Sequence, residues 1–192
     1  SRQVATLEAE LAAREVPARA SGPGLALGVQ RPVRDLVGLV ELGMKDPDDW
    51  APDEVVDALL GTFGGLDPIE LRRLRTALRQ DELGAGGART ATELLVSGVR
   101  FPLELETVDT REARRAARLG ETLAALRAQA LSRATPHELL WTAWERSGLS
   151  RSWREAVRGH GPIAEQADRD LDAVVALFQA AKRYTEREPD GE

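Results

Sequence analysis

The sequence predicts a mainly α protein, a multi-helix bundle with a small N-terminal α/β piece. The apolar fraction of 42% contains few aromatic residues, which make up only 4% of the chain. Alanine, leucine and long charged side chains fill most of the sequence, and these residues have high intrinsic helix propensity. Apolar residues also recur at three- and four-residue spacing, as expected for one buried face on each helix.

Residues 1–30 differ in pattern from the rest of the chain. A helix is predicted over residues 2–15, followed by a short extended piece over residues 16–20. Pro17 restricts that piece to a sheet edge or to the start of a strand. A helix, a short strand and a Gly/Pro-rich loop together are typical of one piece of an α/β layer. We therefore expect residues 1–30 to form one unit and residues 31–192 to form an all-helical unit.

Proline, glycine and threonine indicate where the helices of the second unit begin and end. Thr135 and Glu138 have the spacing of a capping box, and Gly148 is placed to end the helix that they begin. A short helical turn is expected at residues 92–96, and an irregular segment at residues 98–105. Longer helices are expected over residues 32–42, 53–60, 68–80, 109–132, 135–147, 163–186 and from residue 150.

Composition excludes several classes of protein. The formal net charge of −6 argues against a globally basic nucleic-acid binder, so any DNA contact has to be local. The absence of cysteine excludes disulfides and thiol chemistry. No apolar run approaches the roughly 20 residues of a membrane span, and the first residues lack the apolar core of a signal peptide. We expect a cytoplasmic protein without membrane contact.

Candidate catalytic and metal-binding residues are scarce. The two histidines, His137 and His160, are too far apart in the sequence to suggest a zinc site. The phosphate-binding P-loop, the nucleophile elbow and the H-E-x-x-H motif are all missing. Trp141, Trp144 and Trp153 are predicted to anchor contacts between helices. The chain by itself is therefore not expected to be an enzyme or to hold a cofactor.

The most informative stretch is a glycine-rich turn over residues 61–67 that leads into an arginine-bearing helix. Backbone N–H groups in such a turn, together with a helix N-terminus, can bind an anion, and arginine suits phosphate. An ordinary turn with a solvated arginine face stays open as an alternative. Arginine abundance alone has little weight, since Lys45 and Lys182 are the only lysines. The predicted phosphate contacts are Thr62, Gly64, Gly65, Arg72, Arg73 and Arg75.

Several segments resemble, in order, parts of UvrD/PcrA/Rep-type superfamily 1 DNA helicases. Residues 1–17 are similar to the helix and strand after motif IV in the motor subdomain called 2A. Residues 32–40 look like the entry into the inserted helical subdomain 2B, and Gly64-Gly65-Leu66 is similar to its duplex-gripping turn. Residues 139–144 and 168–178 resemble most the actinobacterial members, which include the AdnA/AdnB-type helicase–nucleases.

The resemblance implies that the chain is a fragment of an ATP-dependent 3′-to-5′ DNA helicase. Residues 1–30 would then belong to subdomain 2A and residues 31–192 to subdomain 2B, a non-catalytic accessory part. Its partners would be the backbone of duplex or fork DNA and the rest of the helicase. ATP and Mg would be bound by parts of the parent protein outside this segment. The arginines in 111–118 and 151–158 would offer a second basic surface.

Two other classes of function stay open at this stage. A helical protein-interaction module, without DNA binding, is favoured by the acidic residues between Asp46 and Asp57 and by the net charge. It predicts a partner surface with exposed Leu or Trp side chains. A helical enzyme is the other alternative, and it predicts a deep pocket ringed by carboxylates.

Overall fold

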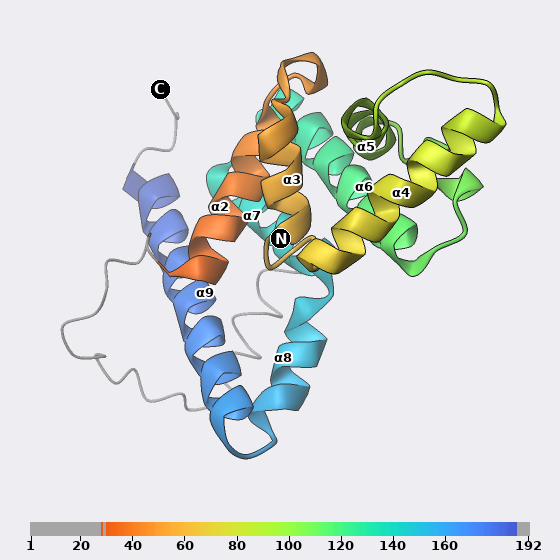
Figure 1. Ribbon diagram of the computed structural model, residues 1–192. Helices are drawn as coiled ribbons and strands as arrows, with labels where there is room; N and C mark the ends of the chain where they lie inside the picture. Colours follow the sequence, from red (N-terminus) through yellow and green to blue (C-terminus); the bar gives the residue numbers. More distant parts are fainter. Residues whose placement is uncertain (1–27, 29, 188–192) are drawn as a thin grey trace.

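The computed structural model describes residue 28 and residues 30–187, and these residues form a bundle of α-helices (Figure 1). No β-strand occurs within these limits, which confirms the predicted mainly α class. The predicted helix and strand of the N-terminal α/β piece lie outside the described residues. The helices are α2 (Arg31–Met44), α3 (Pro52–Leu60), α4 (Pro68–Gly84), α5 (Ala91–Arg100), α6 (Arg111–Leu131), α7 (Pro136–Ser147), α8 (Leu149–Val157) and α9 (Pro162–Arg187).

Helix α6 is the centre of the packing. It contacts α2, α5 and α7, together with the 3-10 helix η3 (Pro102–Thr107) that precedes it. Its apolar stripe includes Ala116, Leu123 and Leu126, which have no exposed surface. Gly120 lies on the same helix where α5 crosses, and a Cβ there would come within 2.2 Å of the Val99 carbonyl oxygen. The small residues of this stripe therefore let neighbouring backbones approach α6 closely.

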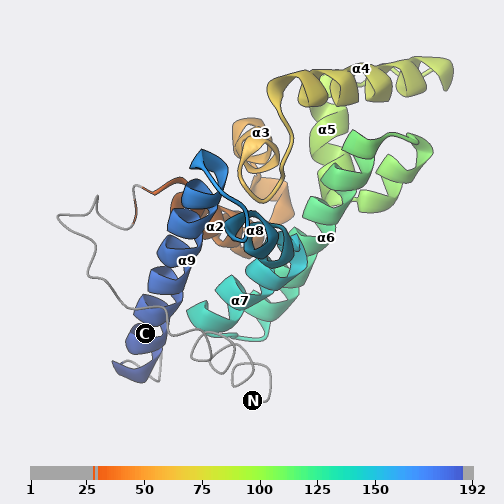
Figure 2. The same ribbon diagram turned by 90° about the horizontal axis from the view of Figure 1, so that it is seen from below.

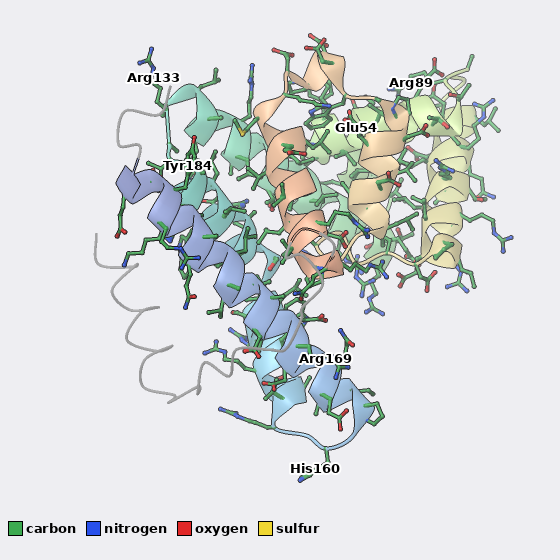
Figure 3. All side chains as sticks on the ribbon, turned by 90° about the vertical axis from the view of Figure 1, so that its left-hand side faces the viewer. Glu54, Arg89, Arg133, His160, Arg169 and Tyr184 are labelled. Atoms are coloured by element: carbon green, nitrogen blue, oxygen red, sulfur yellow. The ribbon has the colours of Figure 1, made fainter. Side chains whose placement is uncertain are left out.

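Helices α8 and α9 form a hairpin whose connecting end extends beyond the other helices (Figure 1), while α9 also packs against α2 and α7. Gly148, in the left-handed conformation with φ of 68°, separates α7 from α8. His160 lies at the tip of the hairpin (Figure 3). No residue of α8 is fully buried, so this helix contributes little to the core.

The helix boundaries agree with the sequence prediction to within two residues, except around α5 and at the end of α4. The predicted turn at residues 92–96 is wrong in extent, because α5 is a ten-residue helix. Thr90 caps it by accepting a hydrogen bond from the Glu93 N–H, and Leu94, Leu95 and Val99 are buried. The segment predicted as irregular is also regular in part, since Gly98 is helical and η3 follows. Helix α4 runs to Gly84, four residues beyond the predicted end.

Candidate functional site

The glycine turn between α3 and α4 is closed by its own backbone. The Gly65 N–H donates to the Gly61 carbonyl at 2.9 Å, and the Leu66 N–H donates to the Leu59 carbonyl at 3.0 Å. Gly65 adopts a φ of 65°, a conformation that glycine takes without steric cost. Gly64 is buried, and a Cβ on it would lie 2.3 Å from the Ala58 carbonyl oxygen. The turn itself therefore requires both glycines.

Thr62 is held by a carboxylate from α2. Its N–H and its hydroxyl both donate to Asp35 Oδ2, at 2.8 and 2.7 Å. The Asp35 side chain is only 14% exposed, and a negative charge at this place repels a phosphate. The amide contacts expected at Gly64 and Gly65, supplemented by Thr62, stay a prediction. In the structure the N–H groups of Thr62 and Gly65 donate to acceptors within the protein.

The start of α4 is stabilised by a capping box that the sequence analysis did not use. Asp67 accepts hydrogen bonds from the N–H groups of Ile69 and Glu70, at 2.7 and 2.8 Å. The Glu70 carboxylate accepts one from the Asp67 N–H in return. Arg115 of α6 then reaches across to Glu70 and to the Gly65 carbonyl. Four N–H groups of the turn therefore have acceptors within the protein, those of Thr62, Gly65, Leu66 and Asp67.

The arginines of α4, unlike the polar groups of the neighbouring turn, have no ion pairs within the described residues. Between Leu71 and Gln80 the helix carries four arginines and no acidic residue. None of the four has an ion pair or a side-chain hydrogen bond within the described part of the chain, although Arg79 lies close enough to the Glu82 carboxylate to lower its pKa. Arg72 and Arg73 are exposed, whereas Arg75 and Arg79 are half-buried.

Two of these guanidinium groups contain buried nitrogens. Arg75 Nε and Arg79 Nη1 are shielded from solvent and have no hydrogen-bond partner. A buried N–H without an acceptor costs about 1–3 kcal/mol, and more when the group is charged. Arg72, Arg75 and Arg79 follow one another at helical spacing, so they lie along one flank of α4. Arg79 is not among the phosphate contacts predicted from the sequence, although its helical spacing from Arg72 and Arg75 is visible there.

Eight of the other arginines in the described chain lie within 4.0 Å of a carboxylate. Surface ion pairs contribute little to stability, but they show which guanidinium groups already have an anion. Arginines within 4.0 Å of a carboxylate are Arg31, Arg34, Arg89, Arg100, Arg114, Arg115, Arg127 and Arg146. Exposed arginines elsewhere, such as Arg111 and Arg118, also lack an ion pair within the described residues. What distinguishes the α4 set is that its four members lie together on a stretch of helix without an acidic residue.

Two pockets lie against the glycine turn. The larger, of about 660 Å³, is lined by side chains of both signs, among them Arg31, Arg115, Glu70 and Asp170. Glu70 is held in the capping box, and Asp170 accepts a hydrogen bond from Gln166. This pocket therefore lacks the ring of free carboxylates that the enzyme alternative predicts.

The tryptophans have the structural role that the sequence predicted. Trp144 is 5% exposed and packs edge-to-face with Trp153 at 5.4 Å, which joins α7 to α8. Trp141 makes a similar contact with Phe178 of α9 at 6.0 Å. His137 packs on the same Phe178 ring.

Comparison with known proteins gives no assignment, since no protein-family model and no curated protein matches the chain. In the part that the structure describes, no group of three or more histidine or acidic residues is arranged to hold a metal ion. None of the described helices has both the length and the apolar character needed to cross a lipid bilayer.

Proposed function

We propose that the chain is part of an ATP-dependent 3′-to-5′ DNA helicase and that its helical domain is a non-catalytic accessory domain. This domain would contact the backbone of duplex DNA through the arginines of α4. The observation that carries the proposal is that four arginines lie together between Leu71 and Gln80 of α4, a stretch with no acidic residue, and have no ion pair within the described part of the chain. The resemblance described above, which extends over residues 31–192, supports it.

The proposed contact uses charge and not backbone amides. Guanidinium groups match phosphate oxygens in geometry and keep their charge at all physiological pH values. Such contacts position a protein on DNA without reading its sequence. They also release counterions, so each phosphate contact adds about 0.9 to the slope of log affinity against log salt. Binding is therefore weak, independent of sequence and strongly sensitive to salt.

A duplex-binding titration tests the proposal. The double variant Arg72→Glu/Arg73→Glu is expected to weaken binding at low salt and to reduce the salt slope by about 2. The matched control is Arg169→Glu/Arg183→Glu, which makes the same charge change at two exposed positions of α9. Absence of duplex binding at low salt, or equal loss in both double variants, would contradict the proposal.

A protein-interaction module is the second candidate, favoured by the acidic residues between Asp46 and Asp57. Part of that charge is already used within the fold, because Asp46 pairs with Arg127 and Asp48 pairs with Arg100. The most exposed large apolar side chains, Leu103, Leu131 and Ile163, come from three different elements. This candidate therefore ranks below DNA contact.

A further inference from the structure

The smaller pocket beside the glycine turn has a different character from the larger one. It has a volume of about 180 Å³ and lies between the turn, α2, α6, α7 and the first residue of α8. Pockets for drug-sized ligands measure about 300–1,000 Å³. The space therefore suits a small group and not a whole organic cofactor.

The charged side chains that line this pocket are all arginines. They are Arg115 and Arg118 of α6 and Arg146 of α7, and no carboxylate is in the lining. Apolar side chains such as Phe63 and Leu119 form the opposite wall. A guanidinium group beside apolar walls attracts an anion more strongly than the same group would in open water, because the local dielectric constant is lower.

The three arginines differ in how free they are to bind. Arg118 is exposed and has no ion pair or side-chain hydrogen bond in the described chain. Arg146 lies 3.7 Å from Glu121, a loose contact between two exposed groups that an incoming anion can replace. Arg115 is fixed by Glu70 and the Gly65 carbonyl, and the Glu70 carboxylate balances its charge, so the charge available to an incoming anion comes from Arg118 and Arg146.

Helix ends do not supply the charge of this pocket. Ser147 is the last residue of α7 and Leu149 is the first of α8, and both line the pocket. The negative end of one helix dipole therefore lies beside the positive end of the other, and the two effects oppose each other. Selectivity for an anion rests on the guanidinium groups alone.

We infer that this pocket binds a single phosphate group through Arg118 and Arg146, with Arg115 behind them. Guanidinium groups are the side chains that recognise phosphate oxygens by paired hydrogen bonds. The phosphate is either free, as inorganic phosphate or a monoester, or one phosphodiester of a DNA backbone. The inference goes beyond the proposed function and does not depend on the arginines of α4.

Amide chemical shifts of the full chain, titrated with inorganic phosphate, test this site. Sodium chloride at equal ionic strength serves as the reference. Saturable shifts are expected at Gly65, Leu119 and Ser147, which line the pocket. Arg118→Gln and Arg146→Gln are each expected to weaken phosphate binding about tenfold, equivalent to about 1.4 kcal/mol. Arg111→Gln, an exposed arginine of the same helix outside the pocket, is the matched control.

Shifts that do not saturate, or equal affinity in Arg118→Gln, Arg146→Gln and the control, would overturn the inference. A duplex with 5′-hydroxyl ends then identifies the source of the phosphate. Competition between duplex and inorganic phosphate assigns the pocket to a phosphodiester, whereas phosphate binding without competition assigns it to a free phosphate or monoester. Loss of duplex binding in Arg72→Glu/Arg73→Glu with phosphate binding retained separates this pocket from the proposed α4 contact.

Discussion

At the scale of single residues, two glycines have opposite effects on the stability of this fold. Gly64 is enclosed by backbone, since a Cβ there would lie 2.3 Å from the Ala58 carbonyl oxygen and 2.5 Å from Leu59 Cα. Gly38, in the middle of α2, has no atom within 4 Å of the place that a Cβ would take. The first glycine is required by packing, whereas the second only lowers helix propensity.

Gly64→Ala is therefore expected to destabilise the protein by about 2–3 kcal/mol, because backbone atoms have to move to admit the methyl group. Gly38→Ala, the matched control, is expected to stabilise it by about 0.5–1 kcal/mol. Urea unfolding of both variants measures the two effects. A Gly64→Ala protein as stable as the wild type would show that the turn can accommodate a methyl group at Gly64 without loss of stability.

Arg133 is a residue whose conformation costs free energy. It ends α6 with a φ of 58°, and the Ala134 N–H donates to the Gln129 carbonyl at 3.0 Å, as in a Schellman motif. The left-handed conformation costs an L-residue about 1–2 kcal/mol. We expect Arg133→Gly to stabilise the protein by about 0.5–1 kcal/mol, the gain being reduced by the freedom of glycine in the unfolded chain.

Thermal unfolding measures the gain in stability of Arg133→Gly. The variant Arg133→Ala shows how much of the change comes from removing the arginine side chain and how much from the backbone conformation. Alanine keeps the cost of the left-handed conformation, so no stabilisation is expected from it. Equal melting temperatures for the glycine and alanine variants would mean that backbone strain at Arg133 is not the cause.

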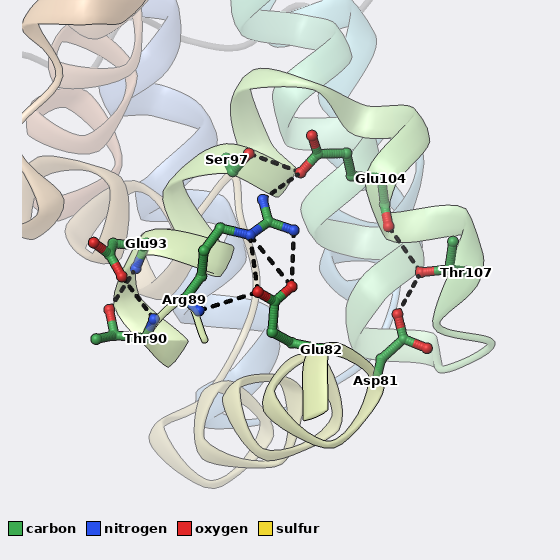
Figure 4. Close-up of polar contacts among 8 residues, drawn as sticks. All are labelled: Asp81, Glu82, Arg89, Thr90, Glu93, Ser97, Glu104 and Thr107. Atoms are coloured by element: carbon green, nitrogen blue, oxygen red, sulfur yellow. Dashed lines mark hydrogen bonds and ion pairs between the residues drawn. The ribbon is translucent and has the colours of Figure 1, made fainter. Parts of the chain in front are cut away.

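At the scale of elements, one partly buried ion pair connects α4 to the residue before the N-cap of α5 (Figure 4). Arg89 donates from Nε and Nη2 to the Glu82 carboxylate, and its backbone N–H donates to Glu82 Oε1 at 3.0 Å. Arg89 Nη1 also lies 3.7 Å from Glu104, which accepts a hydrogen bond from Ser97. The hydrogen bonds from Arg89 hold the pKa of Glu82 below its usual value of 4.5.

This ion pair predicts a pH dependence of stability. Since the pKa of Glu82 is lower in the folded state, its contribution is present above about pH 4.5 and is lost as the pH falls through the folded-state pKa. Glu82→Gln is expected to lower the melting temperature at pH 7, and the difference from the wild type is expected to shrink below pH 4.5. Glu145→Gln, an exposed change, is the control. A difference that stays constant down to pH 3 would contradict this role.

The sequence predicts an element well when the interactions that define it lie close together in the chain. The start of α7 is predicted correctly because Thr135 and Glu138 interact within one turn. The length of α5 is missed because Gly98 and Pro102 suggest a break, whereas tertiary packing of Leu95 and Val99 extends the helix. The Asp35–Thr62 contact spans 27 positions, so no local pattern predicts that the amide of Thr62 is occupied.

At the scale of the whole molecule, burial is distributed unevenly between α8 and the other helices. Helix α9 contributes Val174 and Phe178 to the hydrophobic core. Helix α6 buries seven residues, whereas α8 buries none. The principal aromatic contact of α8 is the Trp144–Trp153 pair. Elements with little buried apolar surface open at free energies well below that of global unfolding. Helix α4, which carries the proposed contact, lies apart from α8 (Figures 1 and 2).

Hydrogen exchange is expected to show a difference in amide protection between α8 and α6. Amides of α8 should be at least about 100-fold less protected than those of α6, a difference of about 2.7 kcal/mol in opening free energy. Trp153→Ala should lower protection in α8 and leave α4 and α5 unchanged, because the ring that it removes packs on Trp144 of α7 and not on those helices. Equal protection in α6 and α8 would contradict the prediction. A loss of protection throughout the chain in Trp153→Ala would show that α8 and the other helices unfold as one cooperative unit.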